Sequence, residues 1–221
     1  MRLTVKREEL LRPLQIVNGV VERRQTLPIL SNLLIKADSD QVTIVGTDLE
    51  VEMVVRADFG AEEPGEVTLP ARKVLDICRT LPEGAEISMA TEGEQATVRP
   101  GKSRFRLSTL PVGDFPSLED MAVLREIKVQ EGELKRLIER THFAMAQQDV
   151  RYYLNGLMLE IREQDIRAVA TDGHRLALSQ CDAEVNPGEL QQVIVPRKGV
   201  TELLRLLEES DELIKLEIGA N

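Results

Sequence analysis

The sequence predicts an α+β protein built from two copies of one unit, each combining two helices with antiparallel strands. Segments that begin at Leu3 and Leu30 recur at Ile127 and Leu154, both displaced by 124 residues. Apolar residues at helical spacing alternate with β-branched runs, and turn-forming residues separate those runs. A shared offset along the chain indicates an internal duplication. The alternative is a chance likeness between two strand-helix-strand modules.

The first unit is expected to occupy residues 1–124 and to hold two helices. In the first helix Pro13 predicts a bend or a later start, because proline removes a backbone donor. Pro70 is expected to precede the second helix, and Pro82 to end it. The expected helices cover residues 7–21 and 71–81, and the expected strands cover 2–6, 33–37, 42–45, 51–57, 86–91, 95–99 and 105–109.

The second unit, residues 125–221, is expected to repeat this order. It ends about two strands before the first unit does, which would leave a sheet edge unpaired. The sequence therefore predicts an incomplete second domain and a chain that is part of a longer protein. The expected elements are strands near 127, 157, 166, 176, 193–195 and 213–218, and helices over 132–146 and 198–207.

Composition bounds the function. The formal charge of −10 is a poor prior for tight DNA binding, which relies on Lys and Arg neutralising phosphates. Aromatic residues are only 3%, so the cores must be aliphatic. Cys78 and Cys181 are expected to be reduced, buried thiols. No signal peptide or long apolar run is visible, which favours a cytoplasmic protein without membrane contact.

Tests for catalytic and metal-binding motifs give weak results. The GKS at residues 101–103 is interpreted as a hairpin turn, because the P-loop glycine and the following helix are missing. Asp48, Glu50 and Glu52 are expected to alternate along a solvated strand face rather than hold a metal. Asp172 and His174 would share a strand face, which leaves a hydrolase as an alternative. The first unit has no matching histidine, and His142 is interpreted as a packed helix residue.

Charge is distributed unevenly along the acidic chain. The second helix of each unit carries a net charge of +2, so the acidic residues must lie on strands and loops. This pattern suits a protein that surrounds a polyanion with its helices, although solvated helix faces could be basic by chance. The polar loop at residues 147–156 adds an arginine and both tyrosines, groups that contact phosphates without reading sequence. The helix cations are Arg72, Lys73, Arg79, Arg197, Lys198 and Arg205, set against Asp76 and Glu202.

At these residues the chain resembles the bacterial beta sliding clamp family, the beta subunit of DNA polymerase III. The motifs TLPILSNLL, GTDLEVEM, LPARK, SRFRLSTLP, DFP, MAQQDVRYYLNG, ATDGHRLA and VIVPRKG occur in family order along the chain. The resemblance implies a DNA-clamp fold of three domains per subunit, the third being absent here. Helices would line a head-to-tail homodimeric ring, and sheets would form its outer face.

The resemblance also implies a function without catalysis, cofactor or metal. A clamp loader would place the ring on double-stranded DNA, where the ring tethers the polymerase alpha subunit and other proteins carrying a clamp-binding motif. Because a ring is held by enclosure, weak contacts suffice, which accounts for the acidic chain. A structural repeat scaffold without nucleic acid remains an alternative.

By motif, each implied site corresponds to a set of residues in this chain. The implied DNA-facing residues are Arg24, Arg72, Gln148, Arg151, Tyr152, Tyr153, Arg197 and Lys198. The implied partner-peptide cleft has Leu154, Thr171, Gly173, His174, Arg175 and Leu176. The implied dimer interface has Lys73, Ile77, Arg104, Phe105 and Leu107.

Overall fold

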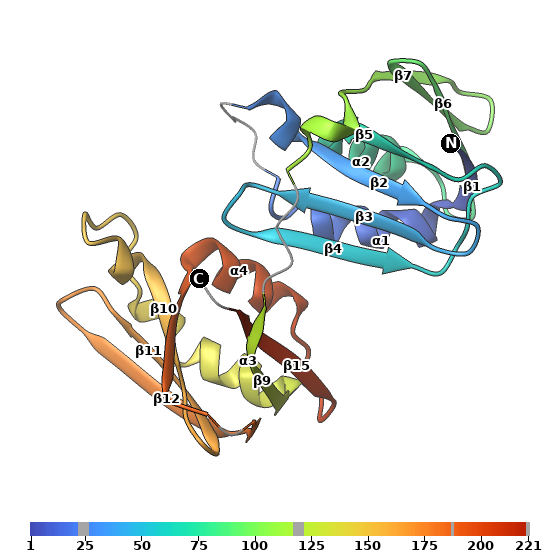
Figure 1. The fold of residues 1–221 in the computed structure, drawn as a ribbon. Helices are drawn as coiled ribbons and strands as arrows, with labels where there is room; N and C mark the ends of the chain where they lie inside the picture. The colour runs from blue at the N-terminus through green and yellow to red at the C-terminus, as the bar shows by residue number, and fades with distance from the viewer. Residues whose placement is uncertain (22–26, 117–121, 187, 220–221) are drawn as a thin grey trace. The chain divides into compact units, whose positions relative to one another are not determined.

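The computed structural model describes residues 1–21, 27–116, 122–186 and 188–219. The chain divides into two compact units, Met1–Leu118 and Glu119–Asn221 (Figure 1). Each unit combines helices with antiparallel sheets, as the sequence predicted. No helix within the described ranges is long and apolar enough to cross a membrane.

The first unit contains two four-stranded antiparallel sheets, with strand orders β1-β6-β7-β8 and β4-β3-β2-β5. Helices α1 and α2 pack against each other, and α1 also packs on β3 and β4 (Figure 1). The elements are β1 (Arg2–Lys6), α1 (Arg7–Val17), the 3-10 helix η1 (Pro28–Ser31), β2 (Asn32–Ala37), β3 (Val42–Thr47), β4 (Glu52–Ala57), β5 (Gly65–Pro70), α2 (Ala71–Thr80), β6 (Glu86–Glu92), β7 (Gln95–Pro100), β8 (Phe105–Ser108) and the 3-10 helix η2 (Val112–Asp114).

One aliphatic core joins both sheets to both helices in the first unit. Leu14 of α1, Val74 of α2, Ile44 of β3 and Ile87 of β6 are all fully buried in it. Alternate strand residues point inward, so each sheet contributes one face to this core. Burial of branched aliphatic side chains supplies the main stabilising term, at roughly 1.5–3 kcal/mol per side chain. Helices and strands thus fold as one unit, which fixes the exposed face of α2.

The second unit repeats this plan with a four-stranded sheet, β12-β11-β10-β14, and a three-stranded sheet, β13-β9-β15. Its core again joins both sheets to two helices, through residues such as Leu134, Leu157, Ile166 and Val200. The elements are β9 (Val123–Gln130), α3 (Glu131–Glu139), the 3-10 helices η3 (His142–Ala144) and η4 (Tyr152–Asn155), β10 (Gly156–Ile161), β11 (Asp165–Thr171), β12 (Leu176–Asp182), β13 (Glu184–Val185), β14 (Gln191–Pro196), α4 (Arg197–Leu206) and β15 (Leu213–Gly219).

One helix in each unit ends earlier than the sequence predicted. Helix α1 stops at Val17 rather than at residue 21, and α3 stops at Glu139 rather than at 146. After α3 the Thr141 hydroxyl donates to the Leu137 carbonyl 2.8 Å away, and the chain continues as η3. Polar side chains of this kind compete with the helical ladder. Of the two alternatives predicted from Pro13, the later start is wrong, because α1 begins at Arg7 and contains Pro13.

Two strand placements and one helix placement differ from those predicted. The sequence did not predict β5 or the short β13, which are defined by their pairing with β2 and β9 rather than by their own composition. Asp48 and Glu50 do not alternate along a strand, because the chain turns there and β4 begins only at Glu52. His142 lies in η3 and not in a regular helix.

Two smaller predictions were confirmed. Gly101 adopts φ +56° in a tight turn between the antiparallel strands β7 and β8, so GKS is a hairpin turn. Cys78 and Cys181 are free and buried. Burial raises the pKa of each thiol to about 11, which keeps both protonated at neutral pH.

Candidate functional site

Helix α2 presents its cations to solvent. The helix begins directly after Pro70 and buries one face through Val74, Leu75 and Cys78. The opposite face is exposed and carries Arg72 and Lys73 in the first turn. Neither of these two side chains forms an ion pair within the part of the chain that the structure describes. Their charge is therefore available to an external anion.

Helix α4 occupies the same place in the second unit and begins directly after Pro196. Arg197 Nη1 donates to the backbone carbonyls of Met145 and Ala146, each 3.3 Å away. These contacts bind the start of α4 to the segment that leads into the polar loop. Further along, Arg205 Nη1 lies 2.9 Å from Glu202 Oε1, so the last cation of α4 is neutralised. The first turn of α4 again holds two cations, Arg197 and Lys198.

First-turn cations oppose the helix dipole in both helices. The positive end of the macrodipole lies at the N-terminus, where a cation costs about 0.3–1 kcal/mol and an anion is favoured. Neither α2 nor α4 has an acidic residue in its first turn. Arg72 and Lys73 therefore lower the stability of α2, and their counterparts Arg197 and Lys198 lower that of α4. The combined positive end of each helix is suited to binding an anion.

The polar loop, residues 147–156, is closed by Asn155. Its side chain accepts from the Asp149 amide and donates to the Asp149 carbonyl, both at 2.9 Å. Tyr152 and Tyr153 project outward, 81% and 49% exposed, with their rings edge to face at 5.9 Å. Gln148 is also exposed. The loop therefore offers aromatic and amide donors on a fixed backbone.

Arg151 is held by Asp149 rather than extended into solvent. Nε and Nη2 of Arg151 each lie 2.9 Å from a different oxygen of the Asp149 carboxylate. This fork-to-fork pair, together with the Arg151 amide, lowers the pKa of Asp149 to about 2. The predicted phosphate contact at Arg151 would have to use the donors left over or displace Asp149. The sequence did not predict this pair, although the two residues are only two positions apart.

The segment Thr171–Leu176 forms a tight turn and not the strand that the hydrolase alternative required. Gly173 adopts φ +89°, and Thr171 Oγ1 donates to the Arg175 carbonyl 2.7 Å away. Asp172 Oδ1 accepts the backbone amides of His174 and Arg175, both at 3.0 Å. The carboxylate therefore caps the turn, and this lowers its pKa.

Around this turn lie an apolar surface and a fixed cation. Leu176 is 64% exposed, and Leu154 of η4 is buried. Arg175 donates to the Phe143 carbonyl at 2.7 Å, and its guanidinium lies 5.5 Å from the Phe143 ring centroid. The sequence did not indicate a role for Phe143, which lies 32 residues from Arg175 along the chain. Only the fold brings these two residues together.

A shallow hollow of about 300 Å³ joins two of the predicted sets of residues. It is open to solvent and lies within the second unit. Gln148 and Arg197 of the predicted DNA-facing set line it beside His174 and Arg175 of the predicted cleft. The structure thus groups residues that are up to 49 positions apart in sequence.

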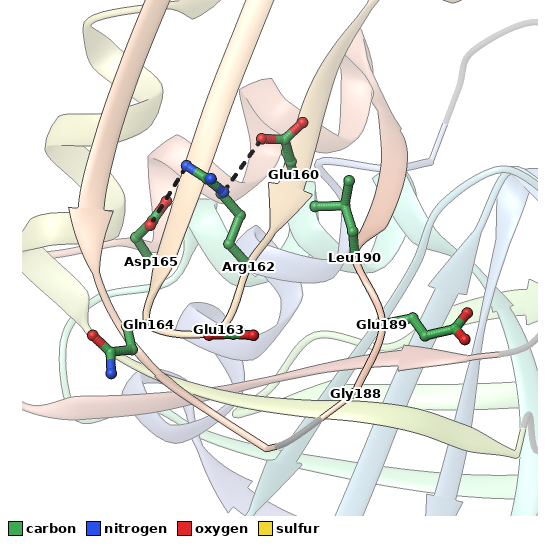
Figure 2. A pocket seen from close by; sticks show the side chains of 8 residues that line it. All are labelled: Glu160, Arg162, Glu163, Gln164, Asp165, Gly188, Glu189 and Leu190. Atoms are coloured by element: carbon green, nitrogen blue, oxygen red, sulfur yellow. Dashed lines mark ion pairs between the residues drawn. The ribbon is translucent and has the colours of Figure 1, made fainter.

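A second hollow, about 700 Å³, is unsuited to an anionic ligand. Its lining includes three glutamates and an aspartate, with Arg162 as the counter-charge. Figure 2 shows Arg162 between Glu160 and Asp165, with ion-pair distances of 3.9 Å to each. The remaining carboxylates, on Glu163 and Glu189, would repel phosphate. This hollow lies outside the predicted sites.

The residues of the predicted dimer interface lie on α2, on the edge strand β8 and, for Arg104, directly before β8. Lys73, Arg104 and Phe105 are exposed, and Phe105 is 39% exposed. Ile77 and Leu107 are mostly covered by their own unit, at 8% and 6% exposure. Their contribution to a subunit contact would therefore be small. Arg24 of the predicted DNA-facing set lies outside the described residues.

The two duplicated α+β units match two successive domain models of one class of protein, the DNA polymerase III beta subunits. A family model described as DNA polymerase III beta subunit, N-terminal domain, matches residues 1–119. The model of the central domain matches residues 128–221. The chain therefore belongs to the DNA polymerase III beta subunit family.

Proteins similar in sequence to this chain include beta sliding clamps. The chain is 52% identical over 220 residues to the beta sliding clamp of Pseudomonas aeruginosa, covering 99% of this chain and 60% of the relative. It is 52% identical over 223 residues to that of Escherichia coli K12, again covering 60% of it. The crystal structure of the P. aeruginosa DNA polymerase III subunit beta matches 99% of this chain and 60% of its own, with a TM-score of 0.94. A P. aeruginosa sliding clamp bound to griselimycin has the same TM-score and identity.

Proposed function

We propose that this chain contributes the first two domains of a DNA sliding clamp. The ring would encircle duplex DNA as a head-to-tail homodimer and tether the polymerase to it. One observation carries the proposal: the first turns of α2 and α4 hold cations where the helix dipole disfavours them. A stability role would place carboxylates there instead. The same departure in both duplicated units supports a shared task, and binding of the phosphate backbone is such a task.

Sliding requires contacts that are weak and independent of sequence. Each neutralised phosphate adds to affinity through counterion release, and many such contacts would fix the protein in place. A few first-turn cations in a chain of charge −10 keep the attraction modest. Arg151 fits the same requirement, because the Asp149 carboxylate partly neutralises its charge. Enclosure, rather than affinity, would then keep the ring on DNA.

The proposed DNA contacts combine these cations with the polar loop. Amides and phenol hydroxyls bind phosphate oxygens without reading bases. No catalytic step is needed, because the proposed role is topological. The proposed set consists of Arg24, Arg72, Gln148, Arg151, Tyr152, Tyr153, Arg197 and Lys198.

The test is retention on closed DNA. The protein at the full length of its relatives would be loaded on a nicked circular plasmid by a clamp loader and passed through a sizing column in high salt. Salt screens the ionic contacts, so a threaded ring should remain bound. Cutting the plasmid once should release it. Equal loss from circular and linear DNA would refute topological binding.

Two matched variants distinguish the effect of the basic first turns on DNA loading from the effect of net charge. Arg72→Glu combined with Lys198→Glu should reduce loading several-fold, because it reverses charge at both first turns. Arg56→Glu changes charge on an exposed position of β4, on the sheet face away from the helices. It should load normally. A structural repeat scaffold without a nucleic-acid partner would show no difference between the two proteins.

We further propose that the turn at 171–176 is part of a cleft for short motifs of partner proteins, among them the polymerase alpha subunit and the clamp loader. Exposed Leu176 offers apolar surface, and Arg175, held by Asp172 and Phe143, offers an orienting cation. A few fixed polar groups on an apolar surface are typical of such peptide sites. The proposed cleft consists of Leu154, Thr171, Gly173, His174, Arg175 and Leu176.

His174→Ala tests the cleft against the hydrolase alternative. The imidazole is exposed, and Asp172 bonds the backbone of His174 rather than its ring. The variant should keep its unfolding midpoint and bind a clamp-binding-motif peptide several-fold more weakly in a fluorescence titration. Glu163→Ala, on an exposed turn elsewhere in the unit, is the control. Loss of a hydrolytic turnover, with peptide binding intact, would favour the enzyme.

A further inference from the structure

Asparagine is followed by glycine at two places in this chain, Asn18–Gly19 and Asn155–Gly156. Such a pair can deamidate without an enzyme, because glycine has no side chain to shield its backbone nitrogen from the asparagine carboxamide. The reaction needs a glycine nitrogen that can lose its proton and an asparagine that can rotate toward it. The sequence gives no basis for ranking the two pairs, so their surroundings in the fold decide.

The Asn155–Gly156 pair is held on both sides of its peptide bond. The Asn155 carboxamide accepts the amide of Asp149 and donates to the Asp149 carbonyl, both at 2.9 Å. Gly156 is buried at the start of β10 and lies opposite Pro196 of β14. A Cβ added at Gly156 would meet Ile194 Cγ2 at 2.6 Å, so the backbone there has little room to turn. Reaction at this pair would require the loop and the strand to open together.

The Asn18–Gly19 pair lies at the end of α1, where fewer contacts hold it. Asn18 is the C-terminal cap of the helix and is half-buried, and its Oδ1 accepts no hydrogen bond among the described residues. The backbone amides of Asn18 and Gly19 donate to the carbonyls of Leu14 and Ile16, each 3.0 Å away. Opening this last turn frees both reacting groups. Helix ends open at a much lower free energy than paired strands in a core.

We propose that Asn18 deamidates spontaneously in the folded protein and that the fold protects Asn155. The Gly19 nitrogen loses its proton and bonds to Cγ of Asn18, the Cγ–Nδ2 bond breaks, and the leaving nitrogen takes a proton from water to become ammonia. Water then opens the cyclic imide. Cleavage at Cγ gives aspartate, and cleavage at the backbone carbonyl gives isoaspartate, in which the chain continues through Cγ. Overall one water is consumed and one ammonia is released.

Either product weakens the end of α1. Aspartate at position 18 adds a negative charge at the negative end of the helix dipole, and α1 has no basic residue in its last turn to offset it. Isoaspartate adds a methylene to the backbone directly after Val17, which is fully buried. Val17 Cγ1 would lie only 2.5 Å from a Cβ built on Gly46 of β3, so the core holds Val17 closely. These consequences do not depend on DNA binding or on the proposed cleft.

Peptide mapping of aged protein tests the proposal. The 221-residue chain would be kept folded at mildly alkaline pH, which favours the deprotonated glycine nitrogen, and sampled over several days. Trypsin should release residues 8–23 and 152–162, each of which contains one of the two pairs. Mass spectrometry should find residue 18 converted at least about tenfold faster than residue 155, because the helix end opens far more often than the strand.

Two controls separate the fold from the local sequence. In urea both pairs lie in an unfolded backbone, so their rates should become similar. Gly19→Ala, in the folded protein, should suppress conversion at residue 18, because the added methyl group shields the nitrogen. Conversion at residue 155 should be unchanged in this variant.

Asn18→Asp reproduces one product and tests its effect on the helix. Its thermal unfolding midpoint should fall below that of the unchanged protein. Gln95→Glu is the matched control, because it adds the same charge to the same unit at an exposed position of β7. Its midpoint should stay close to that of the unchanged protein.

Three results would overturn the proposal. The first is conversion of residue 18 in the folded protein that is no faster than conversion of residue 155. The second is a preference for residue 18 that persists in urea, which would assign the difference to neighbouring residues rather than to the fold. The third is an equal midpoint for Asn18→Asp and Gln95→Glu, which would remove the assigned effect on α1.

Discussion

At the scale of single residues, partners decide what a charge can do. Arg72 and Arg151 both belong to the proposed DNA-facing set. Arg72 forms no ion pair among the described residues, whereas Arg151 forms one with Asp149. The two arginines should therefore differ in their contribution to phosphate binding. Sequence alone ranks them as equals, because a side-chain pair depends on loop geometry.

The Asp149–Arg151 pair gives a pH prediction. Because the folded pKa of Asp149 is depressed to about 2, its stabilising effect is present above its ordinary value of 3.8 and is lost as pH falls through the folded pKa. Arg151→Ala should return the pKa toward 3.8. A carbon-detected NMR titration of the Asp149 carboxyl measures both values. An unchanged pKa in the variant would show that the loop amide, and not the guanidinium, holds the carboxylate ionised.

Arg125 gives a stability prediction. Its side chain is 3% exposed on the core-facing side of β9, and all three guanidinium nitrogens lack a hydrogen-bond partner among the described residues. A buried polar group without a partner costs about 1–3 kcal/mol or more. Arg125→Leu should raise the free energy of unfolding by about that amount in urea. Arg106→Leu, on an exposed position of β8, should change it by less than about 0.5 kcal/mol. A loss of stability in Arg125→Leu would mean that the guanidinium is satisfied in solution.

At the scale of elements, each unit contains a turn with the same hydrogen bond to a threonine, but the residue at the left-handed position differs. The hydroxyls of Thr47 and Thr171 accept the amide two residues later, at 3.0 and 3.1 Å. That later residue is Leu49 in the first unit and Gly173 in the second, with φ of 79° and 89°. Non-glycine residues rarely adopt such angles. The turn is therefore specified by its Thr-Asp side chains strongly enough to hold a leucine in a strained conformation.

Reciprocal substitutions test this reading of the turn. Gly173→Ala should lower the free energy of unfolding by about 1 kcal/mol, because alanine is disfavoured at positive φ. An added Cβ would meet only Arg151 Nη2, at an ordinary 3.4 Å, so backbone strain is the main cost. Leu49→Gly, the matched change in the first unit, should leave stability equal or higher. Urea unfolding of both variants decides, and equal destabilisation would contradict the strain argument.

At the scale of the whole molecule, charge placement and not net charge supports the proposed function. The chain is acidic overall, yet each unit repeats a first-turn pair of cations on its second helix. Summed over several units, weak contacts could guide a duplex without holding it.

The salt dependence of DNA binding tests this placement. Replacing one phosphate-contacting cation should reduce the slope of log K against log salt by about 0.9. Arg72→Ala should show this change for duplex DNA of any sequence, and Arg56→Ala should not. Fluorescence anisotropy at several salt concentrations measures the slope. An identical slope for Arg72→Ala and the unchanged protein would remove α2 from the DNA-binding surface.

Much of the fold could be predicted from the sequence because local patterns determine it. The repeat gave the two units, and apolar spacing placed α2 and α4 within one or two residues. The turn at Gly101 followed from its glycine. The misses have a common cause: β5 and β13 depend on a partner strand, and the ends of α1 and α3 depend on competing turns.

The candidate site could be predicted only as a set of residues. Family motifs selected those residues, but their contacts were not visible along the chain. Two contacts depend on loops that close only in three dimensions: the ion pair of Asp149 with Arg151, and the packing of Arg175 on Phe143. The proposed roles of the individual residues stay predictions.

The sequence by itself determined the duplication, the aliphatic cores and the basic second helices, because periodicity and charge are written along the chain. Only the tertiary structure decided which cations are paired and where a carboxylate caps a turn. Such features arise from contacts between distant segments. Their free energy depends on distance and burial, and a linear pattern contains neither.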